Sequence, residues 1–322
     1  MGKGHKPTEA IVSQVWPEWK GTLRKRSGGW NNTTYFVESR EHRAVLRIYD
    51  THKDRNKIEF EHAVLERLAG AGLPFRTPLP VRTASGETLI QLEDSGKFAC
   101  LFAYIEGESP SGQASDYFES FGEAAGTLSA ALAEIDTGLP AVYRPYYELR
   151  TSYPLCTREA LHGLVLDPPE PLKELLPELT ILAQAYDNVA DALEQLQSLP
   201  HQLVHGDLNA SNLLVDGADS ARVTALLDFE FCTWDVRVMD AAVILSALLG
   251  HEDSERIIRD FWRGYNRRVT LTPGELAAIP VLMLLRKLDV FLHFLTRYWE
   301  GTDEVNVLQQ QVKELAAEVA AM

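Results

Sequence analysis

The sequence predicts an α+β protein of two lobes, a small antiparallel β-rich lobe followed by a larger and mostly helical one. Its length of 322 residues suits about two domains, or one domain built as two lobes. Runs of β-branched and aromatic residues dominate the first hundred or so residues, whereas apolar residues at helical spacing dominate the rest. We therefore expect a β-rich lobe over 1–107, with a hinge at about 102–107, and a helical lobe over 108–322.

The small lobe is predicted to contain two pairs of strands around one helix. The predicted strands are 33–38, 44–49, 87–92 and 97–104. The polar stretch 39–43 separates the first pair, as expected of a hairpin turn. Between the pairs, the helical stripe is formed by Ile58, Glu61, Leu65 and Leu68. Gly70 follows this stripe and predicts the end of the helix.

A segment typical of a linker, Glu-Ser-Pro-Ser-Gly, follows Gly107 and separates the two predicted lobes. Helical spacing then begins after Asp116, which we expect to cap the first helix of the large lobe. A long helix is predicted near 179–199, and Pro200 ends it. A strand, a turn and a second strand interrupt the helices at 213–229, and a last apolar stripe covers 308–319.

The composition excludes several classes of protein. Hydrophobic residues make up 45% of the chain and charged residues 24%, so a mainly disordered or fibrous protein is excluded. Acidic residues outnumber basic ones 46 to 31, which gives a net charge of −15. A protein this acidic repels nucleic acid and anionic lipid, and we expect neither as a partner. If it handles ATP, it needs metal ions and a few well-placed cations.

Cysteines and apolar runs indicate where the protein works. The three cysteines, Cys100, Cys156 and Cys232, are far apart in sequence and form no CxxC pair. We therefore expect a reducing, cytoplasmic environment, without a disulfide framework. The first ten residues have no apolar core, so no signal peptide is expected. No apolar run reaches the roughly 18 residues of a membrane-spanning helix.

The densest group of polar residues lies at 205–212, with the sequence His-Gly-Asp-Leu-Asn-Ala-Ser-Asn. It enters the predicted hairpin, and Asp228 ends the second strand of that hairpin. Because neighbouring antiparallel strands are only about 5 Å apart, we expect Asp207, Asn212 and Asp228 to converge. The oxygens of Asn212 and Asp228 suit magnesium, and Asp207 then remains to accept a proton from an attacking hydroxyl.

The spacing of these residues equals that of the catalytic loop of protein kinases, H-x-D-L-x-x-x-N, with Asp228-Phe229 in place of their D-F-G. A Gly-Asp turn alone is common and carries little weight. The whole pattern, followed by strand, turn, strand and Asp-Phe, is far more specific. Segment 205–212 with 226–230 resembles the aminoglycoside phosphotransferase, choline kinase and type II homoserine kinase superfamily, along roughly residues 20–300.

The resemblance implies a protein-kinase-like fold and a role for each residue of the loop. Asp207 would be the catalytic base, Asn212 and Asp228 the magnesium ligands, and His205 a scaffold residue. Asp240 resembles the buried aspartate with which the family holds its catalytic loop. An acid in the first turn of a helix is equally well explained by the helix dipole, so both interpretations of Asp240 stay open.

In the small lobe, the resemblance implies that Arg47 on the predicted strand 44–49 binds the ATP phosphates. Many relatives have lysine there, but arginine is permanently charged and pairs with phosphate in a bidentate way. Its alternative explanation is an exposed strand residue. Glu59, Glu61 and Glu66 are candidate partners on the following helix, and Glu61 matches the register of the family.

Two further segments complete the implied nucleotide site. The glycine-rich turn around Gly29 would cover the phosphates, although such a sequence alone is typical of an ordinary hairpin. Segment 102–107 resembles the hinge, where backbone groups of Ala103 and Ile105 would pair with adenine. A strand that leads into a linker has the same sequence character.

The sequence thus predicts an ATP- and magnesium-dependent kinase that phosphorylates a hydroxyl of a small metabolite. Glu230 replaces the glycine of D-F-G and no A-P-E segment follows, which disfavours a protein substrate. Aminoglycosides, choline, homoserine and sugars all remain possible acceptors, and the sequence does not indicate an oligomeric state. One alternative is a catalytically silent pseudokinase, which the intact Asp207, Asn212 and Asp228 disfavour. A metal-dependent phosphoesterase is the other, and it lacks recognisable histidine ligand motifs.

Overall fold

The structure is a computed structural model that describes residues 5–26, 32–50, 54–111, 114–249, 251 and 253–322. These residues fall into two compact units. The first unit comprises Met1–Ser111, Glu134–Val142 and Asn212–Phe231. The second comprises Gly112–Ala133, Tyr143–Ser211 and Cys232–Met322.

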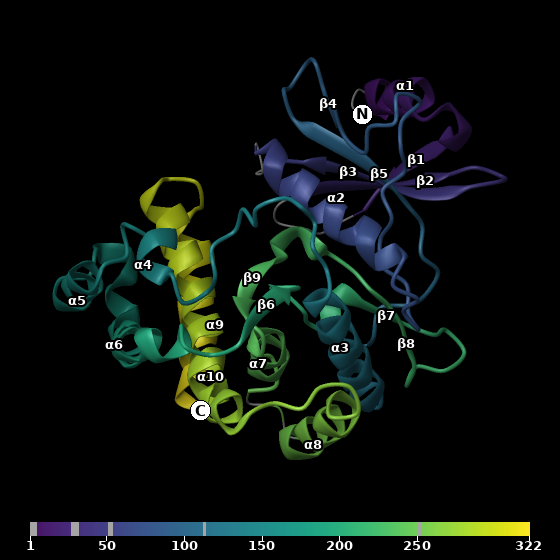
Figure 1. Ribbon diagram of the computed structural model, residues 1–322. Coiled ribbons are helices and arrows are strands. Elements are labelled where there is room, and N and C mark those ends of the chain that lie inside the picture. The colour runs from purple at the N-terminus through teal and green to yellow at the C-terminus, as the bar shows by residue number, and fades with distance from the viewer. Residues whose placement is uncertain (1–4, 27–31, 51–53, 112–113, 250, 252) are drawn as a thin grey trace. The chain divides into compact units, whose positions relative to one another are not determined.

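The first unit is built on an antiparallel sheet of five strands in the order β1-β2-β3-β5-β4 (Figure 1). Its strands are β1 (Thr22–Lys25), β2 (Asn32–Glu38), β3 (Arg43–Tyr49), β4 (Ile90–Gln91) and β5 (Phe98–Ala103). Its helices are α1 (His5–Val15), the 3-10 turn η1 (Pro17–Trp19) and α2 (Arg55–Ala69). The separate hairpin consists of β7 (Leu213–Val215) and β8 (Val223–Leu226), and the 3-10 turn η4 (Phe229–Phe231) follows it.

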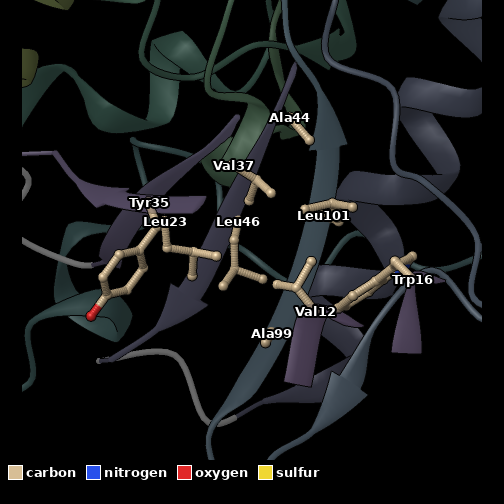
Figure 2. Packing of buried hydrophobic residues seen from close by; sticks show 9 residues of the cluster. All are labelled: Val12, Trp16, Leu23, Tyr35, Val37, Ala44, Leu46, Ala99 and Leu101. Carbon is tan, nitrogen blue, oxygen red and sulfur yellow. The ribbon is translucent and has the colours of Figure 1, made fainter. Parts of the chain in front are cut away.

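Alternation along the strands divides the sheet into an apolar face and a mixed face. On the apolar face, Leu46 and Leu101 are opposite each other in the register of β3 and β5, and both are fully buried. Val12, on α1, and Trp16, the residue after its end, pack on this face, as Figure 2 shows. Arg47 follows Leu46 on β3 and therefore points to the opposite face.

Helix α2 begins where Asp54 accepts a hydrogen bond from the backbone N–H of Asn56 at 3.0 Å, a typical N-cap. Its buried residues are Ile58, Phe60, Glu61, His62, Val64, Leu65 and Leu68. Glu61 is 2% exposed, so this helix carries a carboxylate into the interior of the first unit. A buried acid in an apolar stripe requires a partner that stabilises its charge.

The second unit is mainly helical. Its helices are α3 (Phe118–Ala133), α4 (Leu149–Ser152), α5 (Arg158–Leu166), α6 (Leu176–Leu196), α7 (Met239–Ser246), α8 (Ser254–Tyr265), α9 (Pro273–Trp299) and α10 (Val305–Ala320). The 3-10 turns are η2 (Glu170–Leu175) and η3 (Ala210–Asn212). The last residue of η3, Asn212, already belongs to the first unit. Two short strands, β6 (His201–Val204) and β9 (Thr233–Val236), pair antiparallel within the second unit.

Helices α3 and α8 of the second unit approach so closely that their contact requires glycine. A Cβ atom on Gly264 would lie 1.9 Å from the carbonyl oxygen of Glu119, and one on Gly122 would lie 2.0 Å from that of Phe261. Both distances are far below van der Waals contact. The two backbones therefore pack directly against each other, and Phe121 meets Phe261 beside them with ring centroids 6.3 Å apart.

Most predicted elements are confirmed. Strands 33–38, 44–49 and 97–104 correspond to β2, β3 and β5, and the interruption at 213–229 is the β7–β8 hairpin. The helix predicted near 179–199 is α6, which begins and ends about three residues earlier.

One predicted strand is mostly wrong, and some elements were missed. Only Ile90–Gln91 of the strand predicted at 87–92 pairs, because the carbonyl of Glu87 accepts from the N–H of Thr83 in a tight turn. The sequence also gave no sign of α1, β1 or the β6–β9 pair, which are short or lack alternation. All three cysteines are buried, and none of them forms a disulfide. No helix in the described part of the chain combines the length and apolar character needed to cross a bilayer.

Candidate active site

In the first unit, the guanidinium of Arg47 lies between two carboxylates. Its Nη1 is 3.0 Å from Oε1 of Glu61 on α2, and its Nη2 is 3.4 Å from Oδ1 of Asp228, which follows β8. The side chain is only 14% exposed. Arg47 is therefore not a solvated surface residue of the strand.

Glu61 is the partner of Arg47 among the three glutamates that the sequence offered on α2. Glu59 pairs with Arg55 and Glu66 with Arg82, whereas Glu61 is buried against Arg47 and also accepts a hydrogen bond from the hydroxyl of Tyr49 at 3.1 Å. Burial raises the pKa of Glu61 to about 7, although Arg47 opposes the rise.

Arg47 remains a cation in spite of its burial. Burial by itself lowers the pKa of Arg47, but the charges of Asp228 and Glu61 outweigh it and raise that pKa well above its usual value. The guanidinium carbon also lies 5.2 Å from the centre of the Phe102 ring. Strand β3 thus carries a permanently charged group with a planar set of donors. Such a group suits phosphate oxygens.

Asp228 has an uncommon backbone conformation. Its φ of 63° is the only positive value at a non-glycine residue within the described ranges. This conformation begins directly after β8, where the N–H of Leu227 donates to the carbonyl of Asn212 at 2.7 Å. The hairpin therefore places the backbone of Asn212 beside Leu227, the residue before Asp228. Strained residues of this kind concentrate at functional sites.

The oxygens of Asn212 and Asp228 fit a hard divalent cation such as magnesium. Oδ1 of Asp228 is buried and has no hydrogen-bond donor in the part of the chain that is described; its contact with Arg47 at 3.4 Å is ionic only. Asp207 belongs to the second unit, and its convergence with these two residues stays a prediction.

Glu230 is a residue of this region whose partner the sequence did not reveal. Its Oε2 accepts a hydrogen bond from Nδ2 of Asn32 at 2.5 Å, and the side chain is buried. The first residue of β2 is thereby tied to the segment that follows Asp228. A glutamate in place of the glycine of D-F-G thus has a structural function in the first unit.

The other predicted nucleotide-binding positions are backbone sites. The N–H of Ala103 donates to the carbonyl of Leu79 at 3.2 Å, so only the carbonyl of Ala103 is left to receive an amino group of a base. Ile105 follows β5 in a segment without regular secondary structure. Gly29 lies outside the described residues.

In the second unit, the backbone of the predicted catalytic loop is held by Asp240 on α7. The carboxylate of Asp240 accepts the N–H of His205 at 2.8 Å and the N–H of Gly206 at 2.9 Å. Asp240 is 3% exposed, and burial raises its pKa although these hydrogen bonds oppose the rise. The loop-holding interpretation of Asp240 is therefore confirmed, and His205 is a buried residue of the scaffold.

Asp207 forms a close ion pair that sequence reasoning missed. Nη2 of Arg286, on α9, donates to Oδ1 of Asp207 at 2.7 Å. Nη1 of Arg286 lies 3.4 Å from Oδ2 of Asp289, one turn further along the helix. The signal was present in the sequence, because Arg286, Lys287 and Asp289 interrupt an otherwise apolar run from 281 to 292.

Comparison with known proteins identifies the chain. The phosphotransferase enzyme family matches residues 22–279, which include the loop at Asp207 and both residues that bracket the β7–β8 hairpin. The chain belongs to this phosphotransferase family. It is an enzyme, a small-molecule kinase with an alcohol group as acceptor, and the predicted superfamily is confirmed.

Relatives and solved structures agree with this assignment. A homoserine kinase of Methylorubrum populi is 27% identical over 79% of this chain and 74% of its own length. The structure of a microcompartment-associated aminopropanol kinase, 22% identical, has a TM-score of 0.74 over 97% of this chain and 95% of its own. An amicoumacin kinase in complex with AMP-PNP and Ca²⁺, 17% identical, has a TM-score of 0.69 over 98% and 93%. The predicted protein-kinase-like fold is thereby confirmed.

The second unit of this phosphotransferase also contains a pocket of about 350 Å³ beside Arg286. Its lining is mixed, with apolar and polar side chains from α7, α9 and α10 and further polar ones from the segment after Asp207. The polar lining residues are Asn209, Ser211, Ser246, Arg286, Lys287, Gln311, Glu314 and Glu318. Lys287 and Glu318 pair at 2.9 Å, so part of this charge is already neutralised within the pocket.

Proposed function

We propose that this phosphotransferase transfers the γ-phosphoryl group of ATP to a hydroxyl of a small polar metabolite in the presence of magnesium. The observation that carries the proposal is Arg47, a buried cation shared by Glu61 and Asp228. A cation, a helix glutamate and an oxygen ligand in one cluster are what a magnesium–nucleotide complex requires.

In this proposal, the first unit receives the nucleotide. Arg47 contacts the phosphates, and Glu61 holds Arg47 in place. Asn212 and Asp228 would hold magnesium, which neutralises charge on the phosphates when bound. The carbonyl of Ala103 and the N–H of Ile105 are proposed to pair with adenine, and the turn around Gly29 to cover the phosphates.

In the second unit, Asp207 accepts the proton of the acceptor hydroxyl. The hydroxyl oxygen then forms a bond to the γ-phosphorus, and the bond from that phosphorus to the β–γ bridging oxygen breaks and releases ADP. Most of the acceleration would come from positioning and electrostatics. Asp240 contributes by fixing the backbone of the loop immediately before Asp207.

We propose the pocket beside Arg286 as the acceptor site. Its volume of about 350 Å³ suits a small ligand, and its polar lining suits a metabolite with several hydrogen-bonding groups. Arg286 borders this pocket and also binds Asp207, so the pocket lies within side-chain reach of the proposed base.

The test is a kinase screen of the purified protein with ATP and magnesium against a panel of amino alcohols, hydroxy amino acids, sugars and aminoglycosides. ADP release that depends on the acceptor, together with a phosphorylated product of matching mass, supports the proposal. ATP binding without turnover on the whole panel, also at high acceptor concentration, would favour the pseudokinase alternative. Hydrolysis of phosphate esters without a nucleotide would favour the phosphoesterase.

A further inference from the structure

The contact between Arg286 and Asp207 is the shorter of the two contacts that this arginine makes with carboxylates. Its Nη2 is 2.7 Å from Oδ1 of Asp207, within the range of a charge-assisted hydrogen bond, whereas Nη1 is 3.4 Å from Oδ2 of Asp289. The three side chains are about equally buried, at 20–22% exposure. Arg286 therefore binds Asp207 more closely than it binds Asp289, the acid on its own helix.

Arg286 is itself held from both sides. The hydroxyl of Tyr153 donates to Oδ1 of Asp289 at 2.7 Å and orients this acid behind the arginine. The guanidinium carbon lies 5.9 Å from the centre of the Tyr146 ring. The hydroxyl of Tyr146 in turn donates to the carbonyl of Gly206 at 2.5 Å, one residue before Asp207. Tyr146 thus contacts both the arginine and the backbone of the loop.

A purely structural arginine would be expected to pair best with Asp289. Asp289 lies only three residues away on α9, and burial raises its pKa, so a neighbouring cation helps this acid to stay ionised. The structure has the opposite order of distances. This order indicates that the arginine serves Asp207.

We propose that Arg286 is a positioning residue for phosphoryl transfer, which holds Oδ1 of Asp207 and thereby directs the other carboxylate oxygen at the acceptor hydroxyl. The inference rests on the proposed function, because it requires Asp207 to be the base. It adds a residue from α9, 79 positions further along the chain, to the catalytic loop. By lining the pocket as well, Arg286 links acceptor binding to the orientation of the base.

The positive charge of Arg286 also favours the ionised form of Asp207. Other ionisable groups surround Asp207 from the neighbouring elements of the second unit. They are Tyr146, His205, Asp240 on α7 and Asp289 on α9. The acids among them disfavour ionisation, and Arg286 opposes them at hydrogen-bond distance. Its loss should therefore move the acidic limb of the pH–rate profile to higher pH.

The experiment compares Arg286→Met and Arg286→Lys with a matched control, Arg297→Met, in the full-length protein. Arg297 lies on the same helix, is 22% exposed and pairs with Asp303 at 2.6 Å, but it does not contact Asp207. We expect Arg286→Met to lower kcat by about 10- to 100-fold, with little change in the KM for ATP. Its acidic limb should shift to higher pH. Arg286→Lys should recover part of both effects, and the control should show neither.

A double-mutant cycle separates this inference from the proposed function. If Arg286 acts through Asp207, adding Arg286→Met to Asp207→Asn should cause little further loss. Full additivity, or an Arg286→Met enzyme with the kcat and pH profile of the Arg297→Met control, would overturn the inference while the proposed function stands. An Asp207→Asn enzyme with normal turnover would overturn both. If the methionine variant does not fold, Arg286→Lys carries the test: a wild-type kcat and pH profile would refute the role.

Discussion

Each of the two units contains an arginine that two carboxylates share, and the two clusters differ in which carboxylate is held more closely. In the first unit, Arg47 is close to the buried Glu61 at 3.0 Å and further from Asp228 at 3.4 Å. In the second unit, Arg286 is close to Asp207 at 2.7 Å and further from the supporting Asp289 at 3.4 Å. The acid that supports the arginine is thus the near partner in the first unit, where it is Glu61. It is the far partner in the second unit, where it is Asp289.

This difference fits two distinct tasks. A cation that must turn towards an incoming phosphate should be anchored by a buried acid and only weakly engaged with the metal site. A cation that orients a base should bind the base itself. In the proposed function, the same three-group arrangement would serve ligand binding in the first unit and preorganisation in the second. The predictions below test this division of tasks, beginning with the largest expected effect.

Asp207→Asn should lower turnover by about 10²- to 10⁴-fold, the usual contribution of a positioned general base. The affinity for ATP should change little, because the proposed role of Asp207 concerns the acceptor. Steady-state kinetics with the acceptor from the screen, together with calorimetry of ATP binding, measure both quantities. Asp191→Asn, a change at an exposed aspartate of α6, is the control. Near-normal turnover in Asp207→Asn would remove the base assignment.

Asp228→Ala should raise the magnesium concentration required for half-maximal activity, and Asn212→Ala should raise it less. A carboxylate holds a hard cation more tightly than an amide does. Activity titrated against magnesium at saturating ATP measures the effect. Identical titration curves for wild type and Asp228→Ala would exclude Asp228 as a metal ligand and weaken the parallel between the two arginine clusters.

Arg47→Ala should weaken the binding of ATP far more than that of adenosine, because adenosine lacks the charges that Arg47 would contact. We expect a loss of about 10-fold or more for ATP, on the scale of a hydrogen bond between charged groups. Arg47→Lys should recover only part, since lysine offers a point charge in place of a planar fork. Arg24→Ala on β1, whose side chain is 68% exposed, is the control. Equal losses for ATP and adenosine would mean that Arg47 only supports the fold.

The smallest effect concerns pH and stability. Burial raises the pKa of Glu61 to about 7 in the first unit and that of Asp235 to about 7 in the second. Between the ordinary carboxyl range and pH 7, the folded state therefore binds more protons than the unfolded state, and the free energy of unfolding should fall as pH rises from 5 to 7. Urea denaturation across this range measures the slope.

Glu61→Gln and Asp235→Asn should each flatten this dependence, since each removes one of the two groups. An equally steep decline in both variants would refute the assignment of the titration to these acids. Glu61→Gln should also weaken ATP binding, but less than Arg47→Ala does, because it loosens the arginine without removing it. This comparison sharpens the division of tasks between anchor and phosphate ligand.

The sequence predicted the parts of the site that lie along a few consecutive residues. The segment 205–212 and the hairpin that returns to Asp228 are local, and their spacing alone predicts that the backbone of Asn212 lies beside the residues that lead to Asp228. Glu61 was chosen from three glutamates of α2 by its match to the register of the family. The structure adds the physical reason, because Glu61 lies in the buried stripe of Leu65 and Leu68.

The parts that could not be predicted depend on contacts distant in sequence. Arg286 meets Asp207 across 79 residues, and Asn32 meets Glu230 across 198. Neither pair follows from spacing, because the packing of α9 and the position of β2 decide them. The positive φ of Asp228 was also hidden, since aspartate in a sequence gives no sign that its backbone is left-handed.

The backbone of Asp228 places thermodynamic stability and catalysis in conflict at a single position. A left-handed residue with a side chain costs free energy that glycine would not, so Asp228→Gly relieves strain even as it deletes a proposed metal ligand. Replacement by glycine is therefore a change that a stability screen could reward and an activity screen would reject. A lineage released from the need for catalysis could lose this aspartate without losing its fold, which is a simple physical route from an active kinase to a silent one.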